Sequence, residues 1–143
     1  LTILRLAKER EELRVVDDQI GAPTWCRTIA EATAKILARL IPPDERGKAR
    51  VPPAQSWDEG ISGTYHLSAG GRTAWYGFAS AIVDAERETN PKLARVTPIA
   101  TEEYPLPAPR PKNSLLDNAR LAQTFGLKQM EWKELLVRCL QSG

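Results

Sequence analysis

The chain has 143 residues, of which 42% are hydrophobic and 27% are charged. This length and composition are typical of one globular domain, and no window approaches the ~18 uncharged apolar residues of a membrane span. The 20 basic and 18 acidic residues are spread along the chain and give a net charge of +2. We therefore expect no nucleic-acid partner and no membrane partner.

The first residue and the two cysteines give expectations about processing and about the cellular compartment. It begins with Leu1 rather than Met and shows no secretory signal, so we expect its start to be a cut inside a longer chain. Cys26 and Cys139 are too few and too far apart for a zinc set or a disulfide framework. We expect both to be buried thiols of a cytoplasmic protein.

The first elements are a helix and a strand. Leu1, Leu4 and Ala7 have helical spacing, so the chain enters in a helix. Residues 13–20 include two adjacent valines, and Gly21-Ala22-Pro23 follows, which predicts a strand that ends in a turn.

A second helix should follow that turn, with Thr24 as its cap. Its apolar face comprises Ile29, Ala32, Ile36, Leu37 and Leu40. Residues 42–60 have four prolines and no regular period, which predicts a Pro-rich surface loop. Trp57 in this loop is either a contact of a lid or an anchor of the loop itself.

The central part predicts a strand and the clearest amphipathic helix. Residues 63–69 alternate in polarity before Gly70-Gly71, as in a half-buried strand. Thr73 is a plausible cap for the next helix. The apolar positions of that helix are Trp75, Phe78, Ala79, Ile82 and Val83.

The last part predicts an edge strand and two helices. Residues 95–101 contain Pro98, which suits an edge position, and a stiff proline-rich segment spans 104–111. A short helix should start at Asp117 or Asn118 and close at Gly126. The final helix carries Trp132, Leu135, Leu136, Cys139 and Leu140 on one face.

The sequence contains few candidates for catalytic residues. His66 is the single histidine, and a structural role is favoured for it over a catalytic one. The pairs Asp17-Asp18 and Glu102-Glu103 could act as acid and base, but adjacent strand residues face opposite ways. One member of each pair is therefore expected to be solvated.

Four segments resemble one family. Residues 15–24, Val-Val-Asp-Asp-Gln-Ile-Gly-Ala-Pro-Thr, resemble the V-x-D-Q-x-G-x-P-T segment of the dTDP-4-dehydrorhamnose reductases, which are extended short-chain reductases. Residues 4–7 precede this run, residues 63–68 and 75–79 follow it, and Arg110-Pro111-Lys112-Asn113-Ser114 comes later with Leu116-Asp117. The resemblance covers nearly the whole chain.

The resemblance implies an enzyme that reduces the 4-keto group of dTDP-4-dehydro-L-rhamnose with NADPH. The expected fold is α/β, with mixed helices and short strands. It is the carboxyl-terminal portion of an extended short-chain reductase that lacks most of the dinucleotide-binding domain. Residues 1–143 would form one substrate-binding domain or fragment, with the dTDP-sugar, the missing amino-terminal domain and a homodimer as partners. The alternative is a non-catalytic regulatory or binding subunit of the same fold.

Two features that such an enzyme needs are absent from this sequence. The nine glycines form no Gly-x-Gly pair for a cofactor pyrophosphate. Lysine is also absent four residues after each of Tyr65, Tyr76 and Tyr104, so no Tyr-x-x-x-Lys pair exists. We therefore expect no catalytic and no cofactor-binding residue in this chain, and NADPH to be bound mainly by the missing part.

Four residues are the candidates for substrate binding. Arg110 lies between two prolines. Its guanidinium could bind a phosphate through two parallel hydrogen bonds or, with equal weight, form an ion pair with a carboxylate. Asn113 binds ligand or, as is somewhat favoured, starts a turn. Gln19 and Thr24 flank the Gly21-Ala22-Pro23 turn and face the cleft where strands meet ligand, although the cap role is favoured for Thr24.

The remaining candidate features are the tryptophans and a metal site. Trp25, Trp75 and Trp132 lie on apolar helix faces and are expected in the core or an interface. Some reductases of this family are described with magnesium at a dimer contact where acidic residues converge. Here Trp25-Cys26-Arg27 follows the turn without an acidic residue, and Glu134 remains available, although a solvated role is usual for such a residue.

Overall fold

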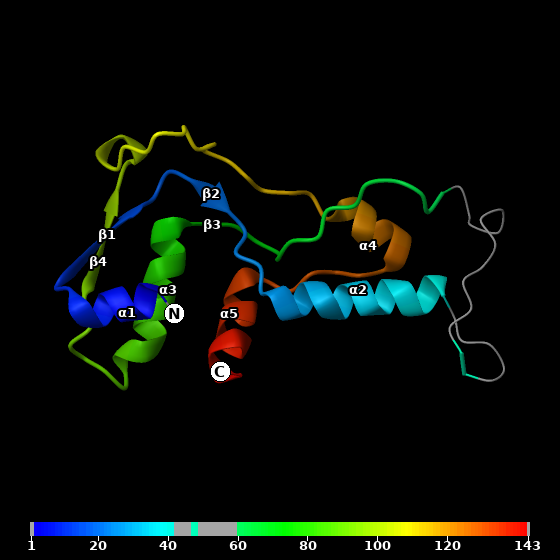
Figure 1. Cartoon of the computed structure of the whole chain (residues 1–143), viewed down its shortest axis with the longest axis horizontal. Coiled ribbons are helices and arrows are strands. Elements are labelled where there is room, and N and C mark those ends of the chain that lie inside the picture. Colours follow the sequence, from blue (N-terminus) through cyan, green and yellow to red (C-terminus); the bar gives the residue numbers. More distant parts are fainter. Residues whose placement is uncertain (1, 42–46, 49–59, 143) are drawn as a thin grey trace.

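The computed structural model describes residues 2–41, 47–48 and 60–142, and Figure 1 shows how their elements are arranged. The predicted mixture of helices and short strands is confirmed. The elements are α1 (Thr2–Glu9), β1 (Glu12–Val16), β2 (Ile20–Gly21), α2 (Cys26–Leu40), β3 (Thr73–Ala74), α3 (Trp75–Arg87), β4 (Arg95–Ile99), the short 3-10 helix η2 (Thr101–Glu103), α4 (Ala119–Phe125) and α5 (Trp132–Gln141).

One end of the molecule is a small α/β unit. β1 and β4 pair in parallel, with Leu13 opposite Val96 and Val16 opposite Ile99. Helices α1 and α3 pack against these strands and against each other. The apolar side chains between them form the first core cluster, which includes Ala7, Leu13, Val83, Leu93 and Ala94.

Helix α3 also belongs to a second cluster, on its other side. Phe78 and Ala81 of α3 pack there against the buried Trp132 and Leu135 of α5. The rings of Phe78 and Trp132 meet edge-on at a centroid distance of 6.1 Å. Because one helix contributes to both clusters, α3 fixes the position of α5 relative to the sheet (Figure 1).

The predicted strand over 13–20 is interrupted in the structure. β1 ends at Val16, and Ile20–Gly21 form the separate strand β2, which pairs antiparallel with β3. The Asp17 amide still donates to the Ile99 carbonyl oxygen at 2.9 Å, and the next residue, Asp18, accepts hydrogen bonds from the Thr101 amide and hydroxyl.

The predicted strand over 63–69 is wrong, since none of its residues joins a ladder with another described residue. The guanidinium of Arg120 donates hydrogen bonds to the carbonyl oxygens of Ser62 and Thr64, at 2.7 and 3.3 Å. In a sheet, the backbone amides of a neighbouring strand would donate to such oxygens. Tyr65 is half-buried while His66 is exposed, so the alternation in the sequence reports burial of an extended segment and not sheet pairing.

Both predicted threonine caps are also wrong. The residues that precede α2 and α3 as caps are Trp25 and Ala74, and neither makes a side-chain cap hydrogen bond. The Thr73 hydroxyl instead donates to the Ala74 carbonyl oxygen at 3.2 Å. Thr24 makes contacts across the fold, which are described with the site.

The helices are otherwise where the sequence predicts them. Gly126 closes α4 with a φ of 65°, as expected of a glycine cap. Pro98 lies in β4, which pairs with β1 alone among the described strands. Most of the predicted 42–60 loop, with Trp57, and also Leu1 fall outside the described residues.

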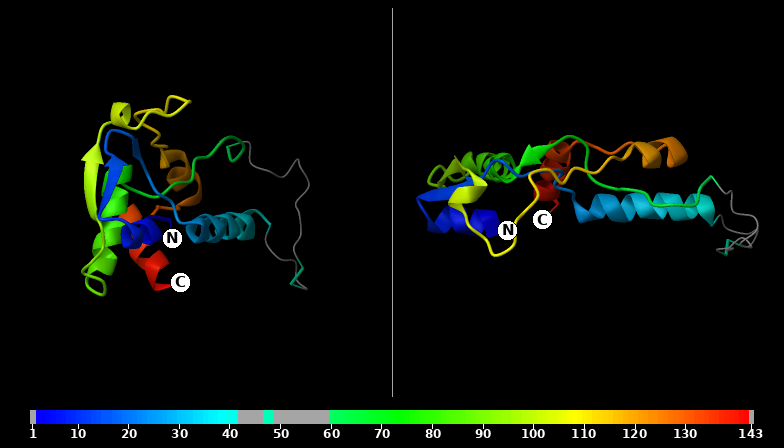
Figure 2. Two further views of the ribbon diagram at one scale, coloured as in Figure 1. Left: turned by 60° about the vertical axis from the view of Figure 1, so that its left-hand side comes forward. Right: turned by 90° about the horizontal axis from the view of Figure 1, so that it is seen from above.

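Helix α2 differs from the others in its burial. In both views of Figure 2 it extends away from the end that holds β1 and β4. Of its predicted apolar face only Ala32 is buried, while Ile29 and Leu37 remain 39% and 50% exposed. Arg39 near its end donates to the Phe125 carbonyl oxygen at 2.6 Å, which joins α2 to α4.

Candidate functional site

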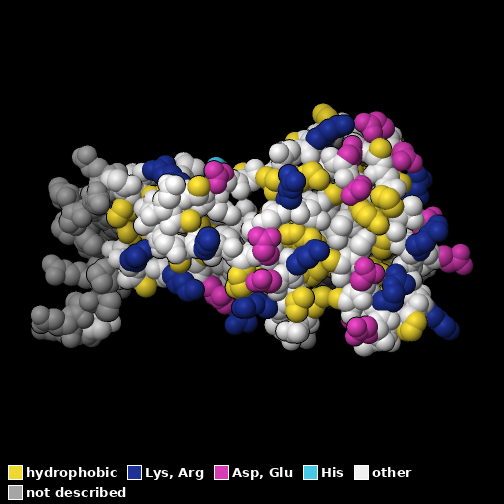
Figure 3. Space-filling model, turned by 180° about the vertical axis from the view of Figure 1, so that it is seen from behind, with side chains coloured by type: hydrophobic (Ala, Val, Ile, Leu, Met, Phe, Trp, Pro, Cys, Tyr) yellow, Lys and Arg dark blue, Asp and Glu magenta, His cyan; other side chains and the backbone are white. Residues whose placement is uncertain are grey.

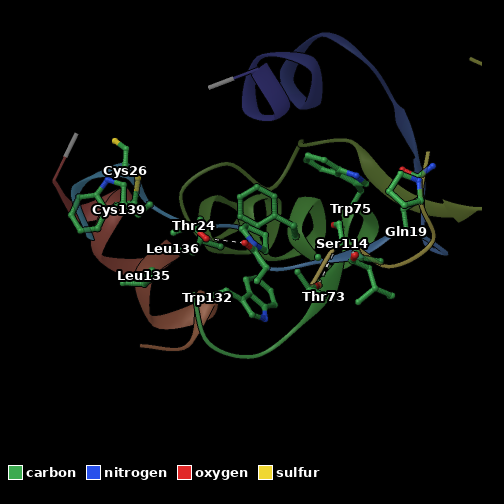
Figure 4. A pocket seen from close by; sticks show the side chains of 18 of the residues that line it. Gln19, Thr24, Cys26, Thr73, Trp75, Ser114, Trp132, Leu135, Leu136 and Cys139 are labelled. Atoms are coloured by element: carbon green, nitrogen blue, oxygen red, sulfur yellow. Dashed lines mark hydrogen bonds between the residues drawn. The ribbon is translucent and has the colours of Figure 1, made fainter. Parts of the chain in front are cut away.

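A cleft of about 640 Å³ lies where β2, the start of α3, the 110–114 segment and α5 meet (Figure 4). Its wall is mostly apolar, with Trp75 and Phe78 from α3 and Trp132, Leu135 and Leu136 from α5. Volume and lining of this kind are typical of small-molecule sites, in which a few polar groups fix the ligand.

Three of the four predicted site residues line this cleft. Gln19 and Thr24 lie on either side of the Gly21-Ala22-Pro23 turn, and Arg110 enters from a segment far along the chain. Asn113 is exposed and does not line it. Its Oδ1 accepts a hydrogen bond from the Leu115 amide at 3.0 Å, as in the turn role that the sequence favoured.

Backbone hydrogen bonds hold the 110–114 segment beside β2. The Ile20 amide donates to the Lys112 carbonyl oxygen at 2.8 Å, and the Ser114 amide donates to the Ile20 carbonyl oxygen at 2.9 Å. A Cβ at Gly21 would lie 3.0 Å from the Ser114 Oγ, so glycine permits this approach. The position of Arg110 at the cleft follows from this pairing.

Arg110 is the one charged side chain among the described residues that line the cleft. It is exposed, and no hydrogen bond or ion pair joins it to another described residue. The carboxylate partner considered from the sequence is therefore not found in the described part of the chain. A guanidinium next to an apolar wall suits an anionic ligand that carries an apolar or planar portion.

Thr24 ties the turn to the segment that leads into α3. Its hydroxyl donates to the Ala22 carbonyl oxygen at 2.9 Å and accepts from the amide of the buried Ala69, also at 2.9 Å. The Thr24 hydroxyl therefore joins the turn at Ala22 to the segment at Ala69, and so stabilises this wall of the cleft.

Thr24→Val should lower the free energy of unfolding by about 1 to 3 kcal/mol, because the buried Ala69 amide loses its acceptor. Thr33→Val is the matched control, since the Thr33 hydroxyl bonds only to a carbonyl in its own exposed helix turn. Urea unfolding of both variants measures the difference. Equal destabilisation by the two changes would contradict the role of Thr24.

The cleft also contains residues that the sequence did not single out as a site. The tryptophans were expected in the core or an interface: Trp132 is buried and Trp25 half-buried, whereas Trp75 is 52% exposed, which rules out the core and leaves the interface for it as a prediction. Thr73 and Ser114 also line the cleft. Ser114 follows the predicted Asn113 directly, whereas Thr73 reaches the cleft only through the pairing of β3 with β2, for which the sequence gives no signal.

The cysteines correct another expectation. Cys26 and Cys139 both line the cleft, Cys26 is exposed, and Cys139 is only partly buried. The prediction of two buried thiols is therefore wrong. Cys26 opens α2, a helix that packs little, and this explains its exposure.

A polar network lies at the Gln19 end of the cleft. The backbone amide and hydroxyl of Thr101 both donate to Asp18, and the Gln19 Nε2 donates to the Thr101 hydroxyl oxygen at 3.0 Å. The Lys112 ammonium lies 3.7 Å from the Asp18 carboxylate. The hydrogen bonds from Thr101 lower the pKa of Asp18.

This shift predicts an acid-dependent loss of stability. The folded-state pKa of Asp18 lies below the ordinary value of 3.8, so its contribution is present above that pH and is lost as the pH falls through the folded pKa. Asp18→Asn should flatten the stability profile there, whereas Asp17→Asn, at an exposed position, should not. Unfolding at a series of pH values measures both, and a profile unchanged by Asp18→Asn would contradict the assignment.

Glu12 should keep part of the acid dependence in that variant. Its pKa is lowered by hydrogen bonds from Thr97 and Arg95, on the strand paired with β1.

The two acidic pairs of the sequence differ in their surroundings. Asp17 is exposed and Asp18 accepts hydrogen bonds from Thr101, in agreement with the prediction of one solvated member of the pair. Glu102 and Glu103 instead lie in η2, where Glu103 pairs with Arg14 at 2.6 Å.

The glycines do not suit a dinucleotide pyrophosphate. Gly70 and Gly71 precede α3, but a Cβ at Gly70 would lie 2.9 Å from the Glu131 carboxylate, and one at Gly71 would collide with it. The space beside this glycine pair is thus filled by an acidic side chain, which repels phosphate. This glycine pair therefore does not fit the pyrophosphate of a nicotinamide cofactor.

Neither a cluster of metal ligands nor a membrane-spanning helix is present in the described part of the chain. Within the described residues, no three or more His, Cys, Asp or Glu side chains gather as metal ligands, and Glu134 is exposed. Nor does any helix there have the length and apolarity to cross a bilayer. On the face shown in Figure 3, basic and acidic side chains are intermixed.

Comparison with known proteins decides the family. The model of the RmlD substrate binding domain matches residues 1–143. The chain belongs to this family. The resemblance found in the sequence is therefore confirmed. The cleft lies within the part of the chain that matches this substrate binding domain.

Individual relatives agree with this assignment. The dTDP-4-dehydrorhamnose reductase of Burkholderia thailandensis is 42% identical over 144 residues, which cover 98% of this chain and 45% of that protein. The Escherichia coli K12 enzyme of the same name is 38% identical, with 97% and 42% covered. The spore coat polysaccharide biosynthesis protein SpsK of Bacillus subtilis is 36% identical, with 98% and 40% covered.

Solved structures show the same fold. The Bacillus anthracis dTDP-4-dehydrorhamnose reductase in complex with NADP matches with a TM-score of 0.75 and 31% identity, over 99% of this chain and 42% of that one. The Clostridium acetobutylicum enzyme matches with a TM-score of 0.70 and 34% identity, over 98% and 42%. The chain thus spans less than half the length of these relatives.

Proposed function

We propose that this chain supplies the sugar-nucleotide site of an NADPH-dependent reductase that converts dTDP-4-dehydro-L-rhamnose to dTDP-L-rhamnose. The observation that carries the proposal is the apolar cleft with Arg110 as its charged lining residue and with Gln19 and Thr24 on its wall. A nucleoside diphosphate sugar combines the required chemistries, because it has a planar base, two phosphates and a hydroxyl-rich ring.

Each part of the cleft has a role in this proposal. Arg110 pairs with the diphosphate, and the backbone pairing of its segment with β2 reduces the freedom that binding must remove. Trp75 and Phe78 exclude water and offer apolar surface to the ligand. Gln19 contributes a hydrogen bond, while Thr24 keeps the turn in place rather than contacting substrate.

In the whole protein, the hydride would come from a bound reduced nicotinamide. Because the sequence has neither a Gly-x-Gly pair nor a Tyr-x-x-x-Lys pair, we place the cofactor and the proton donor in a dinucleotide-binding domain outside this chain. The chain alone is then an inactive part of a cytoplasmic enzyme. A homodimer and magnesium remain hypotheses from the family resemblance, and Asn113 is assigned to the turn.

A calorimetric titration tests the proposal. The protein should bind dTDP-L-rhamnose, the reaction product, and should bind a neutral sugar such as L-rhamnose far more weakly, because the latter offers Arg110 no phosphate. Equal affinity for the two compounds, or no binding of the nucleotide sugar, would contradict the proposed function.

A further inference from the structure

Asp18, Thr101 and Gln19 are joined by hydrogen bonds at one end of the cleft, and this series of hydrogen bonds is called the relay below. The Thr101 backbone amide donates to the Asp18 Oδ1 at 3.1 Å, and the Thr101 hydroxyl donates to the same oxygen. The Gln19 Nε2 in turn donates to the Thr101 Oγ1 at 3.0 Å. Of the three, Gln19 is the one that lines the cleft.

The direction of each hydrogen bond in this relay is fixed by Asp18. An ionised carboxylate can only accept, and a threonine hydroxyl has a single hydrogen to give. That hydrogen goes to Asp18, which leaves the Thr101 oxygen as an acceptor. The Gln19 carboxamide must then turn its nitrogen toward Thr101, because the opposite orientation would set two acceptor oxygens against each other.

This orientation leaves the Gln19 Oε1 for the ligand. No hydrogen bond joins Oε1 to another of the described residues, whereas Nε2 is held by Thr101. Figure 4 shows Gln19 at the same end of the cleft as Trp75 and Ser114. An acceptor at the end of an apolar cleft selects ligands that place a donor there, since an unpaired oxygen in a bound complex is costly.

We propose that Asp18, acting through Thr101, is a positioning residue that presents the Gln19 oxygen to a hydrogen-bond donor of the bound sugar nucleotide. The inference rests on the proposed function and goes beyond it, because it specifies the complementary group. That group is a sugar hydroxyl or the imide N–H of the base.

Substitution of Thr101 tests the relay. Thr101→Val should weaken dTDP-L-rhamnose binding about tenfold, the effect of one hydrogen bond of roughly 1.4 kcal/mol, while Thr101→Ser should restore it. Thr97→Val is the matched control, since the Thr97 hydroxyl on β4 also donates to a carboxylate, that of Glu12, but no hydrogen bond joins it to Gln19 or to another described residue that lines the cleft. Wild-type affinity in Thr101→Val would overturn the proposal.

Charge variants provide a test that a purely structural role would not satisfy. Gln19→Glu keeps an oxygen for the ligand but sets a second carboxylate on the single Thr101 hydrogen, so it should bind no better than Gln19→Ala. Adding Asp18→Asn frees that hydrogen for the new carboxylate and should restore affinity several-fold. No recovery in the double variant would overturn the proposal.

The ligand group is distinguished with dTDP. If Gln19→Ala weakens binding of dTDP as much as that of dTDP-L-rhamnose, the donor belongs to the nucleoside; if only the latter weakens, it belongs to the sugar. Either result supports the relay, whereas an unchanged affinity for both ligands overturns it. Failure of the proposed function looks different, because then the wild-type protein binds neither compound.

Discussion

Replacement of Arg110 by alanine is expected to weaken dTDP-L-rhamnose binding roughly 10- to 150-fold, because hydrogen bonds to a charged group contribute about 1.5 to 3 kcal/mol. Arg110 is exposed and has no hydrogen-bond or ion-pair partner among the described residues, so the change removes neither kind of interaction there. The free energy of unfolding should therefore stay within about 0.5 kcal/mol of the wild-type value. Titration calorimetry and urea unfolding measure the two quantities.

Two controls sharpen this prediction. Arg110→Lys keeps the charge but not the forked pair of donors, so its affinity should lie between wild type and alanine. Arg5→Ala removes an exposed arginine that pairs with Glu9 on α1 and should leave binding unchanged. Wild-type affinity in Arg110→Ala would remove the basis for a phosphate contact at this side chain.

Leu135→Ala is expected to lower the free energy of unfolding by about 2 to 5 kcal/mol, the usual cost of a cavity in a packed core. Leu135 is 1% exposed and packs with Trp132 in the cluster that also forms the cleft wall. The same change should therefore weaken ligand binding, because the wall behind the ligand would no longer be held.

Leu140→Ala in the same helix is the matched control. Leu140 is 38% exposed, so its truncation should cost less than about 1 kcal/mol. Chemical unfolding of the two variants gives the comparison directly. If both leucines cost the same, α5 does not pack through the face that the structure shows.

The helices could be predicted from the sequence because their signals are local. Apolar residues at helical spacing gave α3 and α5, and a glycine gave the end of α4. The false strand over 63–69 shows the limit, because its alternation is real but its hydrogen-bond partners are the distant side chains of Arg120, Asn118 and Thr24 rather than a neighbouring strand. The exposure of most of α2 could not be predicted from the sequence either, because an apolar helix face does not indicate whether another element packs against it.

The candidate site could be predicted in part for the same reason. The motif over 15–24 and the Pro-flanked Arg110 pointed to three residues that the fold brings to one cleft. The contribution of Trp75 and the relay from Asp18 to Gln19 could not be foreseen, because both depend on how distant segments pair. The favoured cap role of Thr24 was wrong because its hydroxyl bonds across the fold to Ala69.

Hydrogen–deuterium exchange with and without dTDP-L-rhamnose tests most directly whether this cleft is the sugar-nucleotide site. Protection should appear in residues 19–24 and 110–114, which line or border the cleft, while β1 and β4 should exchange as before. Binding without protection of those two segments, or protection confined to the β1 and β4 end, would contradict the account.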